Sequence, residues 1–280
     1  MKNYFYFVVL YGFLCCLIVF SFNSCELFKI DNYPEPAETI KGEITDVATG
    51  ERVYTDQGSL GIRVRLRELS WTKTDAPSNY DFYCMKEGDF QNTKVFAGHY
   101  NVRIDGPFIP LVRLNQQGDT LVDESKYVDI KGVTVVNFQV QPFLKIEWVD
   151  KPAYFEGGKI RASFKVTRAV STEIFKSKIE PMGGWNDNFL QVSDVRLYVS
   201  ESPYVGYNDS NTAPYIAIVT YSNNDFEVEP GFGNTITLTS SGTIPPGRTV
   251  FVRAAARIRY TTEGNSRYNY NEAVRVNVPH

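Results

Sequence analysis

Short segments in which apolar and polar residues strictly alternate recur along this sequence and favour an all-β fold. The clearest is Gly61–Glu68, where three apolar residues alternate with three arginines. Because successive side chains of a strand point to opposite faces, this period of two predicts a half-buried strand with an arginine-bearing outer face. No long helical period occurs after the N-terminal region, and only Thr172–Glu180 is predicted to form a short helix.

Strand-like runs occur in both halves of the chain, separated by turns rich in Gly, Pro and Asn. They are Ile40–Ile44, Gly61–Glu68, Gly88–Ile104, Val128–Val140, Phe143–Val149, Lys159–Val166, Val192–Ser200, Tyr215–Tyr221, Thr235–Thr239, Thr249–Ile258 and Ala273–Val278. Many short strands with such turns are typical of β-sandwiches. Gln141-Pro142 interrupts the pattern, so we predict two consecutive β-sandwich domains, residues 39–142 and 143–280.

The N-terminus has the layout of an export signal. Lys2 precedes the apolar run Tyr4–Phe20, and the small residue Ser24 stands directly before Cys25. This arrangement resembles a bacterial lipobox, although Phe22 stands where that motif prefers Leu. It predicts a cleaved signal peptide of residues 1–24, a lipid anchor on Cys25 and a short proline-containing tether of residues 25–38. An uncleaved transmembrane helix is the alternative, because the run is nearly long enough to span a bilayer.

The chain contains four cysteines, and their positions exclude a disulfide in the predicted mature body. Cys15 and Cys16 leave with the signal peptide, and Cys25 carries the lipid. Only Cys84 remains, within an apolar run, and we expect it to be a small buried residue. The hydrophobic share of 43% is enough for packed cores. The net charge of −3 without a basic tail or stripe argues against nucleic-acid binding.

Catalytic and metal-binding patterns are scarce. The two histidines, His99 and His280, provide almost no material for a zinc site or a Ser-His-Asp triad, and we expect His99 to be a turn or strand residue. No phosphate-binding or dinucleotide-binding glycine motif is present. We therefore predict no catalytic residue, no metal site and no cofactor. Two alternatives stay open: a pair of glycosidase carboxylates among the 32 acidic residues, and calcium bound by Asn- and Asp-rich turns.

Aromatic residues fall in several predicted loops beside amide and carboxylate side chains. Sugar rings can lie against an aromatic face, while Asn and Asp can bond their hydroxyls. The candidate glycan contacts are Trp71, Trp185, Asn186, Asp187, Tyr204 and Tyr207. The alternative is that these rings cover the open ends of the sandwiches. The arginines of Gly61–Glu68 could bind an anion, but such residues more often face water or pair with acids.

Several short motifs resemble a family of Bacteroidota lipoproteins of unknown function, DUF3823. They are Cys25–Glu26, Asp31–Tyr33, Thr49–Glu51, Thr55–Gly58, Phe90–Tyr100, Gly106–Pro110 and Gln141–Phe143. The Phe-Ala-Gly-x-Tyr element also resembles transthyretin-like and carboxypeptidase-regulatory-like domains, which are non-catalytic Greek-key sandwiches. The second half, through Val250–Arg257 and Tyr268–Val274, resembles immunoglobulin-like and fibronectin-III-like domains.

The resemblance implies a setting rather than a reaction. Such lipoproteins typically accompany starch-utilisation-type outer-membrane transporters and their glycan-capturing lipoproteins. We therefore expect an outer-membrane protein that faces outward through lipid on Cys25, with a polysaccharide or oligosaccharide, the transporter and its lipoprotein as partners. Display on the periplasmic face and a structural role as a pilus-like or adhesion protein are the alternatives.

Overall fold

The computed structural model describes residues 34–71, 77–208 and 215–280. Residues 37–280 form one compact unit. Cys25, the predicted signal peptide and most of the predicted tether lie outside the described residues. Within the described ranges, no helix is both long and apolar enough to cross a membrane.

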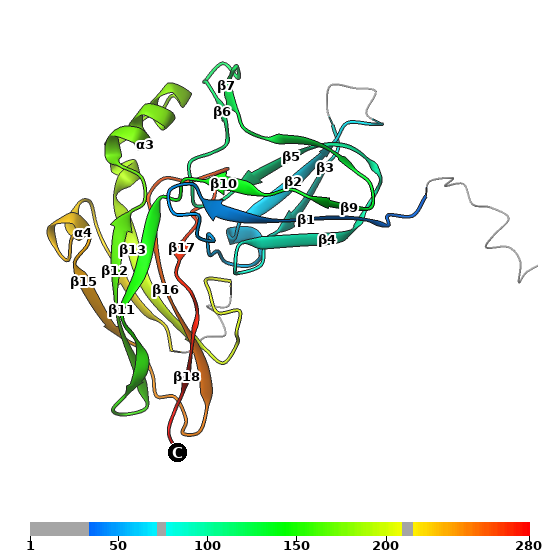
Figure 1. Cartoon of the computed structure of the whole chain (residues 1–280). Helices are drawn as coiled ribbons and strands as arrows, with labels where there is room; N and C mark the ends of the chain where they lie inside the picture. Colours follow the sequence, from blue (N-terminus) through cyan, green and yellow to red (C-terminus); the bar gives the residue numbers. More distant parts are fainter. Residues whose placement is uncertain (1–33, 72–76, 209–214) are drawn as a thin grey trace, which may run out of the picture. The chain divides into compact units, whose positions relative to one another are not determined.

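Strands dominate the described chain, as the sequence predicts, and they assemble into several sheets (Figure 1). The strands are β1 (Glu38–Asp46), β2 (Arg63–Glu68), β3 (Asn79–Tyr83), β4 (Asp89–Val95), β5 (Gly98–Asp105), β6 (Val112–Leu114), β7 (Thr120–Asp123), β8 (Lys126–Ile130), β9 (Val133–Val135), β10 (Phe138–Val140), β11 (Leu144–Phe155), β12 (Lys159–Arg168), β13 (Val192–Ser200), β14 (Ala217–Thr220), β15 (Thr235–Thr239), β16 (Thr249–Ile258), β17 (Asn269–Tyr270) and β18 (Val274–Asn277). The helices are α3 (Thr172–Ile179) and α4 (Asp225–Val228), with 3-10 turns η1 (Gly58–Leu60), η2 (Glu180–Met182) and η3 (Asp187–Leu190).

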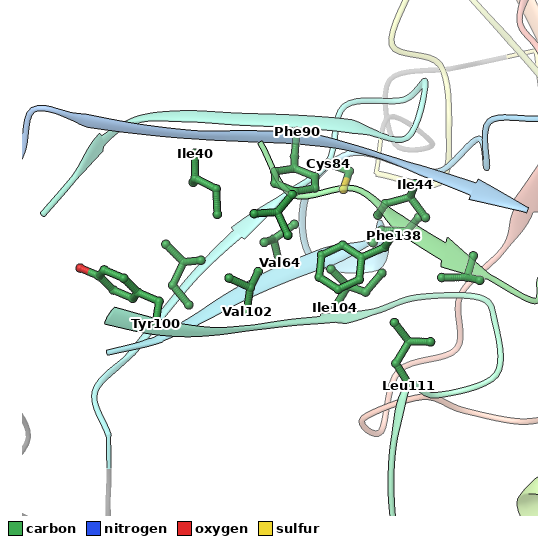
Figure 2. Close-up of a cluster of buried hydrophobic side chains, with 14 of the residues drawn as sticks. Ile40, Ile44, Val64, Cys84, Phe90, Tyr100, Val102, Ile104, Leu111 and Phe138 are labelled. Atoms are coloured by element: carbon green, nitrogen blue, oxygen red, sulfur yellow. The ribbon is translucent and has the colours of Figure 1, made fainter. Parts of the chain in front are cut away.

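In the first half, two sheets enclose one hydrophobic core. One has the order β10-β1-β4, with β9 also paired to β1, and the other has the order β3-β2-β5-β8. Ile40 and Phe90 of the first sheet point toward Val102 of the second (Figure 2). Cys84 is buried in this core, as predicted, and burial raises the pKa of its thiol well above the usual value. The thiol is therefore a packing group rather than a nucleophile.

The second half is also built from two sheets. One sheet has the order β11-β12-β15, and the other has the order β14-β13-β16-β17, with β18 also paired to β16. Phe164 of β12 and Val195 of β13 meet in the same buried cluster. The predicted short helix is confirmed as α3, whose N-terminus is capped by the side chain of Ser171.

Every multi-residue strand ladder stays on one side of Pro142, which itself forms an isolated bridge with Phe108 of the first half. Buried hydrogen bonds cross the junction between the halves, including one from Arg253 to the carbonyl oxygen of Thr55 at 2.9 Å. The all-β prediction is confirmed, whereas the division into domains 39–142 and 143–280 stays a prediction. Glu38, the last residue of the predicted tether, pairs with Val95 of β4, and the tether itself stays a prediction.

Candidate functional site

Trp185 and Asn186 directly precede η3, and Asp187 is its first residue, so the three lie together as their spacing requires. The indole nitrogen of Trp185 donates to Asp187 Oδ1 at 2.8 Å, and Asn186 Oδ1 accepts from the amide of Asn188 at 2.9 Å. The ring of Trp185 packs against Phe175 in the core of the second half. Some of the polar atoms predicted to meet a sugar therefore already stabilise their own turn.

Tyr204 and Tyr207 lie in the loop after β13, and their surroundings differ. Tyr204 is 54% exposed. Tyr207 stacks on Tyr268, with ring centroids 5.6 Å apart, and its amide donates to the hydroxyl of Tyr270 at 3.2 Å. Tyr204 is thus available on the surface, whereas Tyr207 contributes to an aromatic cluster.

Trp71 lies in the first half, just after β2. It is 41% exposed, and its ring contacts that of Phe96 edge to face, with ring centroids 5.9 Å apart. The predicted glycan contacts therefore form three local groups, and their role in glycan binding stays a prediction.

A pocket of about 340 Å³ lies over the outer face of the sheet β3-β2-β5. The sheet supplies its arginine-rich floor, and the segment 106–114 supplies an apolar wall that includes Leu114 of β6. Met182 of η2 and Glu263, which precedes β17, line it from the second half of the chain. The pocket is therefore built from both sides of the junction.

The alternation in β2 brings the arginines to this pocket. Arg63, Arg65 and Arg67 share one face of the strand, and their apolar neighbours are buried in the sandwich core. The register of β5 adds Asp105 opposite Arg63 and Arg103 opposite Arg65. Side chains from three strands thus form one polar surface, which is the outer face of an antiparallel sheet.

At one end of this surface, the charges are closely paired. Arg63 contacts Asp105 at 2.6 Å and also contacts Asp81 and Glu263 at 3.5 and 3.4 Å. Arg65 donates hydrogen bonds of 2.7 Å to both carboxylate oxygens of Asp81, and these bonds lower the pKa of Asp81. The arginine donors at this end already have acid partners.

Asp105 is held from two sides. Its second oxygen lies 2.6 Å from the buried guanidinium of Arg267. Burial nevertheless raises the pKa of Asp105 above its usual value, against the opposing charges of Arg267 and Arg63. A carboxylate flanked by two guanidinium groups is an anchor for those arginines.

At the other end, the pairing is sparse. Arg67 donates to Asn101 Oδ1 at 3.3 Å, and Arg103 donates to the same oxygen at 2.7 Å. Arg103 also lies 3.7 Å from Asp123, and among the described residues no carboxylate lies within ion-pairing distance of Arg67. Burial, followed by the charge of Arg103, lowers the pKa of Arg67. This end of the pocket therefore presents guanidinium donors to solvent.

Sequence reasoning found the arginine face but treated anion binding as the lesser alternative. It missed Arg103 and Asn101, because their place beside Arg67 depends on the β2–β5 register. Tyr127 of β8 was also missed; it lies opposite Asn101 in the β5–β8 register and is 58% exposed. The alternation of β2 alone could not indicate which strand becomes its neighbour.

Metal and histidine positions add little to this site. His99 is a residue of β5 and contacts Asp129 at 2.8 Å, so the expectation of a turn or strand position is confirmed. In the part of the chain that the structure describes, no cluster of three or more His, Cys, Asp or Glu side chains could hold a metal ion.

Several solved structures have folds similar to that of this chain. A DUF3823 family protein from Bacteroides uniformis is 51% identical, with a TM-score of 0.81 over 87% of this chain and 100% of that chain. A candidate carbohydrate-binding protein from Bacteroides uniformis is 20% identical, with a TM-score of 0.59 over 87% and 100% of the two chains. A DUF3823 family protein from Parabacteroides merdae is 18% identical, with a TM-score of 0.57 over 88% and 100%.

The two likenesses near 20% identity show a shared fold and nothing more. No protein-family model matches the sequence, and no curated protein matches it.

Proposed function

Because this chain belongs to the DUF3823 family, we propose that it is a non-catalytic surface protein that binds a glycan through the pocket over the β3-β2-β5 face. The observation that carries the proposal is this pocket, in which guanidinium donors lie beside an apolar wall. Binding sites commonly combine an apolar lining with a few polar groups that fix the orientation of the ligand. The candidate carbohydrate-binding protein with the same fold supports the proposed ligand class.

A binding role also fits the chemistry of the acids in the pocket. Asp105 is clamped by Arg63 and Arg267, and Glu263 contacts Arg63 as well. A glycosidase needs one carboxyl group that donates a proton and a second that acts as a base or nucleophile. Asp105 and Glu263 instead hold the arginine array in place. Hydrolysis of a bound glycan that is lost in Asp105→Asn would contradict the non-catalytic assignment.

We further propose that lipid on Cys25 anchors the protein in the outer membrane, facing outward, beside a glycan transporter and its glycan-capturing lipoprotein. The sequence motif around Ser24 and Cys25 supports the anchor. Two acyl chains would hold the protein stably, whereas one chain gives only marginal binding. Metabolic labelling with a fatty acid tests it: label should appear in the wild-type chain and be absent from Cys25→Ala. Equal labelling of both chains would refute the anchor.

Affinity electrophoresis of the purified chain through gels containing neutral and acidic polysaccharides tests glycan binding. Calorimetry then measures the dissociation constant for any polysaccharide that retards the protein. Failure of every polysaccharide to bind the folded chain would refute the proposed ligand class.

Two matched variants test the place of binding. Leu114 lines the pocket and is 41% exposed, whereas Leu121 on the partner strand β7 is 42% exposed and does not line it. We expect Leu114→Trp to narrow the pocket and weaken binding about tenfold, equivalent to about 1.4 kcal/mol. Leu121→Trp should bind like the wild-type chain. Equal affinities of the two variants would place the glycan elsewhere.

A further inference from the structure

Two guanidinium groups at one end of the pocket share one neutral acceptor. Arg67 of β2 and Arg103 of β5 both donate to Asn101 Oδ1. Asn101 is fully buried, and its amide nitrogen donates to Ser125 Oγ at 2.6 Å, which directs the carbonyl oxygen toward the arginines. Each guanidinium has five N–H donors, so most donors of this pair have no acceptor within the described residues.

The charge of the pocket lining is positive although the whole chain carries a net charge of −3. Four arginines line the pocket, but both lining carboxylates, Asp105 and Glu263, contact Arg63. Asp81 is held by Arg65. Within the described residues, one carboxylate lies within ion-pairing distance of this pair: Asp123, 3.7 Å from Arg103. Two partly desolvated guanidinium groups, Arg67 and Arg103, therefore share one carboxylate and keep an excess positive charge.

An exposed aromatic ring lies next to these donors. Tyr127 faces the same side of the sheet as Asn101, its register partner, and stacks on His99 with ring centroids 6.3 Å apart. The side chain of Tyr127 is 58% exposed and lies in register with Asn101 and Arg67 across the sheet. A six-membered sugar can place its C–H face on such a ring while a charged substituent reaches the arginines.

We propose that Arg67 and Arg103 bind the acidic group of an anionic glycan, a uronic acid carboxylate or a sulfate ester, with its sugar ring on Tyr127. This proposal rests on the proposed glycan-binding function and names the chemical class of the ligand. A planar guanidinium can donate two parallel hydrogen bonds to a carboxylate or sulfate, and such charge-assisted bonds are the strong ones. The anion supplies a second counter-charge, since Asp123 alone serves both guanidinium groups.

Matched polysaccharides separate the charge from the sugar. Calorimetry compares polygalacturonate with its fully methyl-esterified form, and chondroitin sulfate with desulfated chondroitin; polyglutamate serves as an anion without sugar. We expect the acidic member of at least one pair to bind about tenfold or more tightly than its matched form. The pair that responds identifies carboxylate or sulfate as the recognised group. Binding should weaken as salt increases.

The outcomes distinguish this inference from the function on which it rests. Tight binding of neutral glycans alone would overturn the acidic ligand but keep the glycan-binding function. Failure of all glycans would overturn both. Equal binding of polyglutamate would overturn the sugar component.

Variants then locate the recognised group. Arg67→Gln and Arg103→Gln should each weaken binding of the responding acidic glycan about tenfold or more, and Arg67→Lys should restore part of it by returning the charge without the planar fork. Arg275→Gln, an exposed arginine of β18 outside the pocket, is the matched control and should bind normally. Thermal unfolding confirms that each variant folds. Wild-type affinity in folded Arg67→Gln and Arg103→Gln would overturn the assignment.

Discussion

Arginines are used in two opposite ways in this molecule. In the buried network around Arg253 and Asp194, each guanidinium meets carbonyl, carboxylate or aromatic partners. On the β3-β2-β5 face, Arg67 and Arg103 share one amide oxygen. Buried charge persists only when its partners come from the protein, whereas donors that lack such partners are free to bind a ligand. The contrast separates a structural use of arginine from a proposed binding use.

The first test removes the most buried arginine. Arg253 is 1% exposed and donates to the carbonyl oxygens of Thr55 and Asn271 at 2.9 and 3.0 Å. Arg253→Met fills similar space but leaves both acceptors without these hydrogen bonds, including the one that crosses the junction to Thr55. We expect it to lower the free energy of unfolding by about 3–5 kcal/mol, measured by urea denaturation.

Arg275→Met is the control for this test, because Arg275 is exposed and its replacement should change stability by no more than about 0.5 kcal/mol. Equal midpoints for the two variants would show that the buried network contributes nothing to stability. The contrast between the two arginine regions would then fail.

The second test removes the acid of the buried network. Asp194 accepts from Arg196 at 2.7 Å, Arg257 at 2.6 Å and the hydroxyl of Tyr268. Burial raises the pKa of Asp194, but the hydrogen bonds from Tyr268 and Arg196 and the charge of Arg257 outweigh it and hold the pKa below its usual value. Asp194→Asn should cost about 3 kcal/mol at neutral pH, because it leaves both guanidinium groups without their anion.

The pH dependence of that cost follows from the direction of the shift. A carboxyl group whose folded pKa lies below its unfolded value of about 3.9 stabilises the fold above that pH. This contribution is lost as pH falls through the folded pKa. Urea denaturation from pH 7 to pH 3 should therefore show the gap between wild type and Asp194→Asn narrowing below about pH 4. A constant gap would contradict the ionic role of Asp194.

The third test compares two arginines of the same strand. Arg65 is paired in a bidentate manner with Asp81, whereas Arg67 has no acid partner within the described residues. Arg65→Gln should cost up to about 1 kcal/mol, which is the usual range for a partly exposed ion pair. Arg67→Gln should cost less or raise stability, because it relieves the repulsion from Arg103. A larger loss in Arg67→Gln would assign Arg67 a structural role.

Local patterns in the sequence were sufficient for the fold class and for several elements. Alternation predicted β2 and its arginine face, and the capping Ser171 agrees with the short helix α3. The strand β3 and the hairpin of β6 and β7 were not predicted, because their runs are short and largely exposed. Pairing with neighbours, rather than their own pattern, makes these segments strands.

The candidate site was harder to predict because its parts come from distant segments. Arg103 and Tyr127 meet the arginines of β2 only through strand register, and Glu263 reaches Arg63 across 200 positions of sequence. Aromatic residues in loops were visible in the sequence, but their surroundings were not. Trp185 packs against Phe175, and the aromatic and amide residues of its loop do not reveal this contact in the sequence. Spatial neighbours therefore decide whether a residue type supports structure or remains available for binding.

The smallest expected effect on stability concerns the aromatic residues in loops. It tests the same distinction between side chains that have partners within the protein and side chains that are available to a ligand. Tyr204 is more than half exposed, so Tyr204→Ala should change the free energy of unfolding by no more than about 0.5 kcal/mol. Tyr154→Ala, at a 44% exposed position of β11, is its control. If Tyr204 contacts a glycan, calorimetry will show weaker binding in Tyr204→Ala and unchanged binding in Tyr154→Ala. Equal affinities of Tyr204→Ala and the wild-type chain would remove Tyr204 from the candidate contacts, and exposure alone would then not identify a binding residue in this loop.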